Sequence, residues 1–211
     1  MRWATEFVAS FFFMAAIGLS AGSGSPWATL VIGAALLSMV GAADQSGGAH
    51  CNPAVSLAML LSGRMEMKDF PSRVIMQTLG ALAALFASRS VTGRTMQMQL
   101  GPGIQAIQGL AVESVFTFAS ALGVVAGSRR GGFSFYRLVS GFIMVAVVLA
   151  GHELSGGLCN PALGIGVQVT SATIDGYSAE HSWIYLIGPL IGGVFAGILL
   201  KFFSRSSNQI H

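Results

Sequence analysis

The sequence predicts an all-α membrane protein with six transmembrane helices, two re-entrant half-helices and an inverted three-plus-three repeat. Composition is the first observation: 53% of the 211 residues are hydrophobic and 9% are charged, whereas a soluble domain carries about 25% charged residues. The second observation is a series of apolar segments long enough to cross a bilayer. The third is the tetrapeptide Cys-Asn-Pro-Ala, which occurs at 51–54 and again at 159–162.

A helix that spans the hydrocarbon core needs about 20 mostly apolar residues. Six segments satisfy this requirement: 4–22, 27–44, 69–90, 108–128, 134–151 and 182–203. Two further apolar pieces, 53–62 and 161–169, are too short to cross, and each begins at Asn-Pro-Ala. We therefore expect six spanning helices and two half-helices that enter the membrane without crossing it.

The basic residues predict the orientation in the membrane, because they concentrate in cytoplasmic loops. With a cytoplasmic N-terminus, only Arg89 and Arg94 lie outside. Nine lie on the cytoplasmic side: Arg2, Arg64, Lys68, Arg73, Arg129, Arg130, Arg137, Lys201 and Arg205. We therefore expect both termini in the cytoplasm and a location in the plasma membrane, here a bacterial inner membrane. This topology accounts for the net charge of +3, and no nucleic-acid partner is expected.

The chain also repeats along its length. Glu6 lies 46 residues before Asn52, and Glu113 lies 47 residues before Asn160. Each half has three spanning helices, and because three is odd, the second half enters the membrane upside down relative to the first. Such repeats place their sites near the membrane midplane, so the sequence favours a channel or transporter over an enzyme. The repeats cover approximately 1–92 and 105–207 of a single channel domain, 1–211.

Asn-Pro-Ala at the head of a short apolar run predicts a helix start. Asparagine is a preferred N-cap, and proline suits the first helical position because it lacks the N–H that is unpaired there. The two motifs are Asn52, Pro53 and Ala54, and Asn160, Pro161 and Ala162. An ordinary capped surface helix explains one copy but explains two poorly. Two inverted half-helices instead meet head to head, with both positive dipole ends and both asparagine amides directed at one point. That field excludes cations and suits a neutral solute.

At these residues the chain resembles the aquaporin (major intrinsic protein) family along nearly its whole length. The matching pieces are TEFVASFFF, SGGAHCNPAVSLA, AVESVFTF and SGGLCNPAL. Two Asn-Pro-Ala motifs in inverted halves, each with an upstream glutamate, form a specific combination. The resemblance implies six helices around a narrow pore in each protomer, assembly as a homotetramer and no cofactor.

The glutamates Glu6 and Glu113 need partners, because a charged carboxylate in hydrocarbon costs several kcal/mol. Glu113 in particular lies within an otherwise apolar helix. Hydrogen bonds from the backbone of the re-entrant loops satisfy this need. The family resemblance implies the same role: the glutamates hold the loops so that the loop carbonyls line the pore. We favour this structural role over proton transfer.

The resemblance also predicts a selectivity filter at four positions. Counted from the two asparagines, these are Ile32, Val148, Gly157 and Leu163. Water-selective members pair a histidine or aromatic residue with an arginine at this constriction, and here Leu163 occupies the arginine position. None of the four side chains is charged, aromatic or a hydrogen-bond donor. The filter is therefore expected to be wide and apolar, with weakened exclusion of cations.

A wide apolar filter predicts a passive channel for small uncharged solutes. The expected solutes are polyols, urea and metalloid acids such as arsenite or boric acid, with some water, and arginine-free bacterial members of the family look like metalloid facilitators. A water-selective aquaporin is the main alternative. A secondary transporter is less favoured, because the half-helix starts carry amides and thiols and no ionisable coupling residue. A non-conducting junction protein is also less favoured, because both motifs and both glutamates are intact.

Two cysteines and two histidines lie near the motifs. Cys51 and Cys159 directly precede the pore asparagines. Free cysteine behaves as a small apolar filler, and the alternative is that at least one thiol reaches the pore and makes it sensitive to mercurials. His50 and His152 have no metal-ligand spacing, so no metal site is expected, and His50 is expected to hydrogen-bond within its loop.

Overall fold

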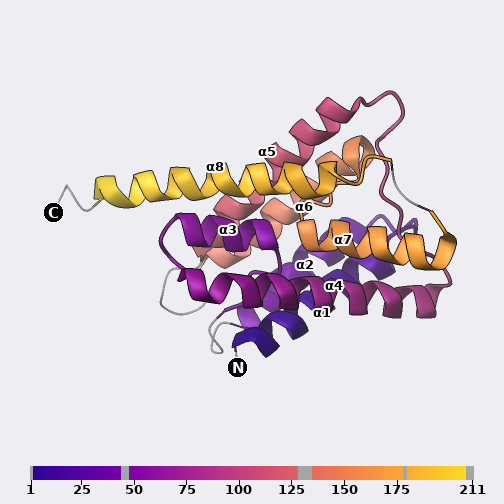
Figure 1. Cartoon of the computed structure of the whole chain (residues 1–211), viewed down its shortest axis with the longest axis horizontal. Helices are drawn as coiled ribbons and strands as arrows, with labels where there is room; N and C mark the ends of the chain where they lie inside the picture. The colour runs from indigo at the N-terminus through magenta and orange to yellow at the C-terminus, as the bar shows by residue number, and fades with distance from the viewer. Residues whose placement is uncertain (1, 44–47, 128–134, 178–179, 208–211) are drawn as a thin grey trace.

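The computed structural model describes residues 2–43, 48–127, 135–177 and 180–207 (Figure 1). Every element in these ranges is a helix. The α-helices are α1 (Arg2–Ser20), α2 (Ala28–Ala42), α3 (Pro53–Leu61), α4 (Phe70–Thr92), α5 (Ala106–Gly127), α6 (Phe135–Ser155), α7 (Pro161–Thr170) and α8 (Ile184–Ser207). A 3₁₀ turn, η2 (Met67–Asp69), precedes α4, and a π-helical turn, η3 (Ser171–Asp175), extends α7. Arg129 and Arg130 of the orientation prediction lie outside the described residues.

The predicted membrane spans agree with the structure except at the second one. Five segments of the described chain are long and apolar enough to cross a bilayer: Arg2–Ser20, Met67–Thr92, Ala106–Val125, Leu138–Ser155 and Ile184–Ser204. Helix α2 has 15 residues, which at 1.5 Å per residue span about 22 Å, less than the roughly 30 Å of hydrocarbon. The prediction of 27–44 was too long because apolar composition continues beyond the helix, through Trp27 and Ala43 at its two caps.

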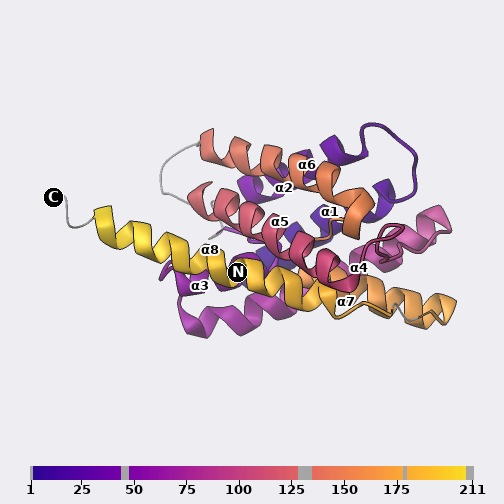
Figure 2. The same ribbon diagram turned by 90° about the horizontal axis from the view of Figure 1, so that it is seen from above.

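The helices pair in the same way in the two halves of the chain. Helix α1 packs along α4, and α5 packs along α8 (Figures 1 and 2). Each half-helix also packs against a long helix of the other half, α3 against α8 and α7 against α4. In Figure 1, α3 and α7 lie between α8 and α4. The half-helices therefore hold the two halves together, and their N-terminal ends lie in the interior.

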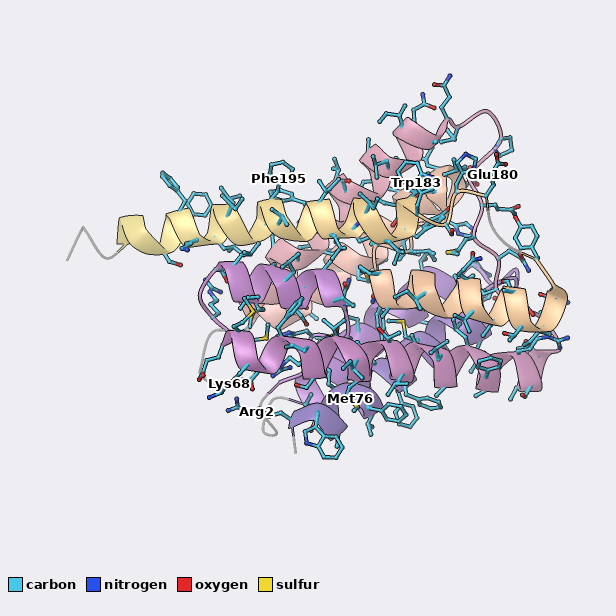
Figure 3. The ribbon with its side chains drawn as sticks, viewed as in Figure 1. Arg2, Lys68, Met76, Glu180, Trp183 and Phe195 are labelled. Atoms are coloured by element: carbon cyan, nitrogen blue, oxygen red, sulfur yellow. The ribbon has the colours of Figure 1, made fainter. Side chains whose placement is uncertain are left out.

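Large apolar side chains cover the outside of the bundle. Phe142 is 60% exposed and Phe195 is 61% exposed. Figure 3 shows Phe195 projecting away from the other helices. Such a surface is incompatible with water over large patches but matches a hydrocarbon environment. The chain is therefore an integral membrane protein.

Glycines let α8 approach two other helices closely. A Cβ atom at Gly192 would lie 2.3 Å from the carbonyl oxygen of Ser114 in α5. A Cβ atom at Gly193 would lie 2.4 Å from the carbonyl oxygen of Ala54 in α3. Because both neighbours are backbone atoms, neither can move aside cheaply. The position of the first half-helix thus depends on glycine in α8, as expected for close helix packing in membranes.

The substitution Gly193→Ala is expected to destabilise the protein by about 1–3 kcal/mol, the usual result of overpacking. Thermal unfolding in detergent measures this effect. Gly41→Ala in α2 is the matched control, because among the described residues no atom outside the adjacent residues and the backbone of α2 itself lies within 4 Å of the added carbon. Alanine is favoured over glycine inside a helix by about 1 kcal/mol, so this control should be as stable as the parent or more so. An equal loss of stability in both variants would contradict the close-approach explanation.

Candidate pore and filter site

The two half-helices begin at asparagine caps, as the sequence predicts. The side-chain oxygen of Asn52 accepts a hydrogen bond from the N–H of Ala54 at 2.8 Å, at the start of α3. The side-chain oxygen of Asn160 accepts one from the N–H of Ala162 at 3.0 Å, at the start of α7. A proline occupies the first turn in both cases. The predicted helix starts are therefore confirmed.

The two asparagines also bind each other's loops. The amide nitrogen of Asn52 donates to the carbonyl oxygen of Cys159 at 2.8 Å. The amide nitrogen of Asn160 donates to the carbonyl oxygen of Cys51, also at 2.8 Å. These reciprocal bonds place the two half-helix N-termini face to face. A primary amide has two N–H groups, so each asparagine keeps a second donor beyond this cross-link.

Both cysteines adopt an unusual backbone conformation. Cys51 has φ of 55° and Cys159 has φ of 49°, in the left-handed region that non-glycine residues seldom occupy. The same conformation at both positions turns each carbonyl toward the opposite asparagine. Local strain of about 1–3 kcal/mol persists only where the surroundings enforce it, and here the reciprocal bonds do so.

Glu6 is completely buried and receives hydrogen bonds from the first re-entrant loop. The N–H of His50 donates to both of its carboxylate oxygens, at 3.0 and 2.9 Å. Two side chains of α4 add to these bonds: Gln77 donates its amide, and Arg73 places its guanidinium nitrogen 3.3 Å from Oε2. Arg73 also donates to the carbonyl oxygen of Gly48 at 3.1 Å.

Glu113 holds the second loop with different partners. It accepts from the Ser155 hydroxyl at 2.7 Å, from the N–H of Leu158 at 3.1 Å and from the N–H of Cys159 at 2.7 Å. All three of these donors are neutral. Both glutamates therefore bind the loop ahead of a half-helix, as the sequence analysis expects. Their contribution to conduction stays a prediction.

Arg73 and Gln77 are site residues that sequence reasoning missed. Arg73 was assigned only to the cytoplasmic charge balance, yet its side chain is 7% exposed and ion-paired with Glu6. Gln77 also donates to the hydroxyl of Ser56 at 2.9 Å, and Ser56 lies 2.9 Å from Nδ1 of His50. The spacing of Arg73 and Gln77 could have revealed them, because polar residues four apart lie on one face of an otherwise apolar helix.

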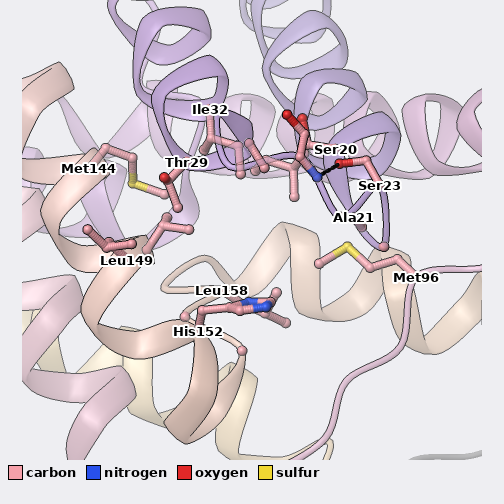
Figure 4. Close-up of a pocket in the computed structure, with 18 of the residues that line it drawn as sticks. Ser20, Ala21, Ser23, Thr29, Ile32, Met96, Met144, Leu149, His152 and Leu158 are labelled. Atoms are coloured by element: carbon pink, nitrogen blue, oxygen red, sulfur yellow. Dashed lines mark hydrogen bonds between the residues drawn. The ribbon is translucent and has the colours of Figure 1, made fainter.

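A cavity of about 530 Å³ lies beside the second half-helix start (Figure 4). Ile32, Val148, Gly157 and Leu163 all line it, so the structure brings together the four residues predicted for the filter. They come from α2, α6, the loop before α7 and α7 itself. Gly157 has φ of 62°, a left-handed conformation that favours glycine. Their function as a filter stays a prediction.

Several other residues of the cavity wall were not predicted. Met96 comes from the connection between α4 and α5, and Met144 and His152 come from α6. Hydroxyl side chains from the end of α1 and the start of α2 add polar groups, among them Ser20 and Thr29. The four predicted filter residues are apolar, but the cavity around them carries hydroxyls and one imidazole.

Both thiols are buried away from this cavity. Cys51 is 0% exposed and Cys159 is 1% exposed, and neither lines the cavity. The hydroxyls of Ser10 and Thr117 lie beside the two thiols, each one helical turn after a loop-holding glutamate. These positions favour the interpretation of the cysteines as small fillers. Within the described residues, no group of three His, Cys, Asp or Glu side chains is placed to hold a metal ion.

Apolar helices around two half-helices that meet at buried asparagines define a membrane protein of the aquaporin fold. The chain belongs to the major intrinsic protein family, whose family model matches residues 2–200. It is similar to aquaporin TIP4-4 from Zea mays, with 36% identity over 167 residues, which are 76% of this chain and 64% of the maize protein. It is also similar to aquaporin TIP2-1 from Arabidopsis thaliana, with 31% identity over 84% of this chain and 72% of that protein. The chain thus spans less than two thirds of the maize relative.

Solved structures show the same fold. The aquaglyceroporin from Plasmodium falciparum superposes with a TM-score of 0.83 at 18% identity, over 99% of this chain and 100% of that chain. An FNT family ion channel superposes less closely, with a TM-score of 0.59 at 14% identity, over 96% and 89% of the two chains. At these identities the likeness concerns the fold alone. The predicted fold class and family are confirmed.

Replacing Glu113 by glutamine is expected to lower the free energy of unfolding by about 1–3 kcal/mol, the usual loss for an unsatisfied buried group. In the parent, the N–H groups of Leu158 and Cys159 bind different oxygens of the Glu113 carboxylate. A glutamine has one acceptor oxygen, so in the variant its NH₂ group faces one of these two N–H groups and leaves it without an acceptor. Thermal unfolding in detergent measures the loss. Ser155→Ala removes one donor and keeps the carboxylate, so it should cost about 1 kcal/mol. A glutamine variant as stable as the parent would show that the carboxylate does not hold the loop.

Arg73→Met is expected to destabilise the protein by about 3–5 kcal/mol, because it leaves the buried carboxylate of Glu6 without its cation. The double variant Arg73→Met, Glu6→Gln removes both charges and should recover part of this loss. Chemical or thermal unfolding of the three proteins gives the comparison. If the double variant is no more stable than Arg73→Met alone, the ion pair is not the source of the effect.

Proposed function

We propose that this protein is a passive channel for small uncharged solutes, namely polyols, urea or undissociated metalloid acids such as arsenite and boric acid, with some water. One observation carries the proposal: the four apolar filter positions line one cavity beside the facing half-helix starts. The proposed path passes Asn52 and Asn160 and then the filter of Ile32, Val148, Gly157 and Leu163. Family membership supports a channel without covalent chemistry.

The size and chemistry of the cavity support solutes larger than water. Its volume of about 530 Å³ is many times the roughly 30 Å³ that one water molecule occupies in the liquid. The four filter side chains offer no donor to a molecule that passes them. Water then loses more hydrogen bonds than the filter replaces, and it permeates slowly. A solute with an apolar face loses less.

Exclusion of cations in this proposal rests on the half-helices. Each α-helix N-terminus carries roughly half a positive charge, and two such ends face each other at the asparagine cross-link. Leu163 adds no charge to this field. We therefore propose that cation exclusion is weaker than in a channel with an arginine at this position, but is retained.

A water-selective pore is the second candidate. The maize and Arabidopsis relatives are named aquaporins, and this favours water. The Plasmodium structure is named an aquaglyceroporin, and its likeness concerns the fold. We favour the solute channel, because the four filter side chains offer no hydrogen bond that would bind or orient a single water molecule. A secondary transporter and a non-conducting junction protein have no feature of the described residues in their favour.

The proposed setting follows from the charge distribution and the family. We propose that both termini lie on the cytoplasmic side and that the protomers form a homotetramer with one pore in each protomer. The bacterial inner membrane stays a prediction from the sequence. Cross-linking in membranes and protease protection of terminal tags test the assembly and the orientation.

Leu163→Arg is expected to invert the permeability ranking. The long charged side chain enters the cavity, narrows it and adds fixed donors, so glycerol and urea permeability should fall at least about tenfold relative to water, equivalent to about 1.4 kcal/mol of barrier. Stopped-flow light scattering on proteoliposomes measures water, glycerol, urea and boric acid in the same preparation. An unchanged ranking would remove Leu163 from the filter.

The matched control is Leu163→Met, because Leu and Met exchange with little change in volume or polarity. It should keep the parent ranking. If the parent protein conducts water quickly and none of the larger solutes, the water-selective alternative is correct. If solute accumulates against its gradient, the protein is a transporter.

A further inference from the structure

We propose that His152 is a specificity-determining residue of this channel: its imidazole hydrogen-bonds the solute that passes the filter cavity. This inference rests on the proposed function. It gives the apolar filter a polar contact that the four predicted positions lack, and it assigns that contact to a residue outside them.

The position of His152 follows from the geometry of α6. It lies four residues after Val148, and side chains four apart lie on the same face of a helix. Both residues line the cavity. The carbonyl oxygen of His152 accepts from the N–H of Gly156 at 3.0 Å, which ties the last turn of α6 to the loop before α7. The imidazole therefore projects from backbone that is held in place.

The ring is directed into the cavity. Figure 4 shows the side chain projecting from α6 into the space between that helix and Met96. The side chain is exposed, and among the described residues no protein hydrogen bond to either ring nitrogen is found. A solute that enters the cavity thus meets an imidazole whose polar atoms are available.

Two of the cavity hydroxyls, those of Ser23 and Ser25, are placed differently. The hydroxyl of Ser23 accepts from the N–H of Ser25 at 3.2 Å, and the hydroxyl of Ser25 accepts from the N–H of Trp27 at 3.2 Å. These bonds stabilise the turn between α1 and α2. The serine oxygens are therefore partly used by their own loop.

A neutral imidazole suits a solute that both donates and accepts hydrogen bonds. One ring nitrogen donates and the other accepts, so polyols and urea find both partners on one side chain. The apolar face of such a solute then passes Leu163 and Val148.

The charged side chains of the segments around the cavity lie outside its wall. Arg94 donates to the carbonyl oxygen of Gly22 at 2.8 Å and so lies at the rim, because Gly22 lines the cavity. Glu153 follows in the chain and is exposed, and Asp175 lies 3.4 Å from the amide nitrogen of Gln97. None of the three charged side chains lines the cavity, and no other titratable residue among the described ones does.

The test compares His152→Leu with His152→Gln in proteoliposomes at the same pH on both sides. At pH 7.5, His152→Leu should lower glycerol and urea permeability about three- to tenfold, the factor expected for one lost hydrogen bond. His152→Gln keeps one donor and one acceptor and should stay within about twofold of the parent. Equal permeability of the leucine variant and the parent, or a higher value, would overturn the proposal.

The two proposals fail in different ways. If the parent conducts neither water nor any solute above the lipid background, the proposed function fails, and this inference fails with it. If the parent conducts solutes and both His152 variants conduct them at the parent rate, only the inference fails. Thermal unfolding of each variant confirms that the compared proteins are folded.

Discussion

The structure depends on two reciprocal hydrogen bonds, in which Asn52 and Asn160 each donate to the carbonyl of the residue before the other. Two half-helices that stop at the midplane leave N–H groups where no lipid can satisfy them. Capping by Asn52 and Asn160 solves this for each helix separately. The cross-link then fixes the two ends against each other, and it requires the left-handed backbone of Cys51 and Cys159. The hydrogen bonds that satisfy the half-helix starts are thus the same interactions that fix how the two starts face each other.

The glutamates extend this constraint into the surrounding helices, but by different means. Glu113 is satisfied by neutral donors of its own half. Glu6 shares its charge with Arg73 across 67 positions of sequence, in a pair that is almost completely buried. A buried charge pair needs further hydrogen bonds to offset desolvation, and His50 and Gln77 supply them. The first loop is therefore bound to α4 electrostatically, whereas the second is bound by a cluster of neutral groups.

The sequence predicted the features that depend on short patterns. Asn-Pro-Ala specifies a capped start within three residues, and the fold class follows from apolar length and the repeat. The end of α2 was missed because apolar composition does not mark a helix end without a cap signal. Arg73 was missed because its partner is distant in sequence. Met96 was missed because the connection after α4 folds back, with the carbonyl oxygen of Met96 accepting from the Ser171 hydroxyl at 3.3 Å.

In the channel that we propose, selectivity is the difference between the hydrogen bonds that a solute loses on leaving water and the contacts that the cavity wall gives it. At Asn52 and Asn160, amide N–H groups can donate to the solute, and the dipoles of the two half-helices make the local field positive. This combination favours a neutral molecule with an acceptor and opposes cations. At Leu163 a solute finds only apolar contact, so the free-energy cost of losing hydration is smallest for a molecule with an apolar surface of its own. The imidazole of His152, one helical turn after Val148, can both donate and accept a hydrogen bond. It therefore lowers the cost of losing hydration without closing the cavity. In the channel that we propose, an apolar filter with an imidazole beside it therefore selects by the shape of a solute and by its balance of donors and acceptors more than by its size.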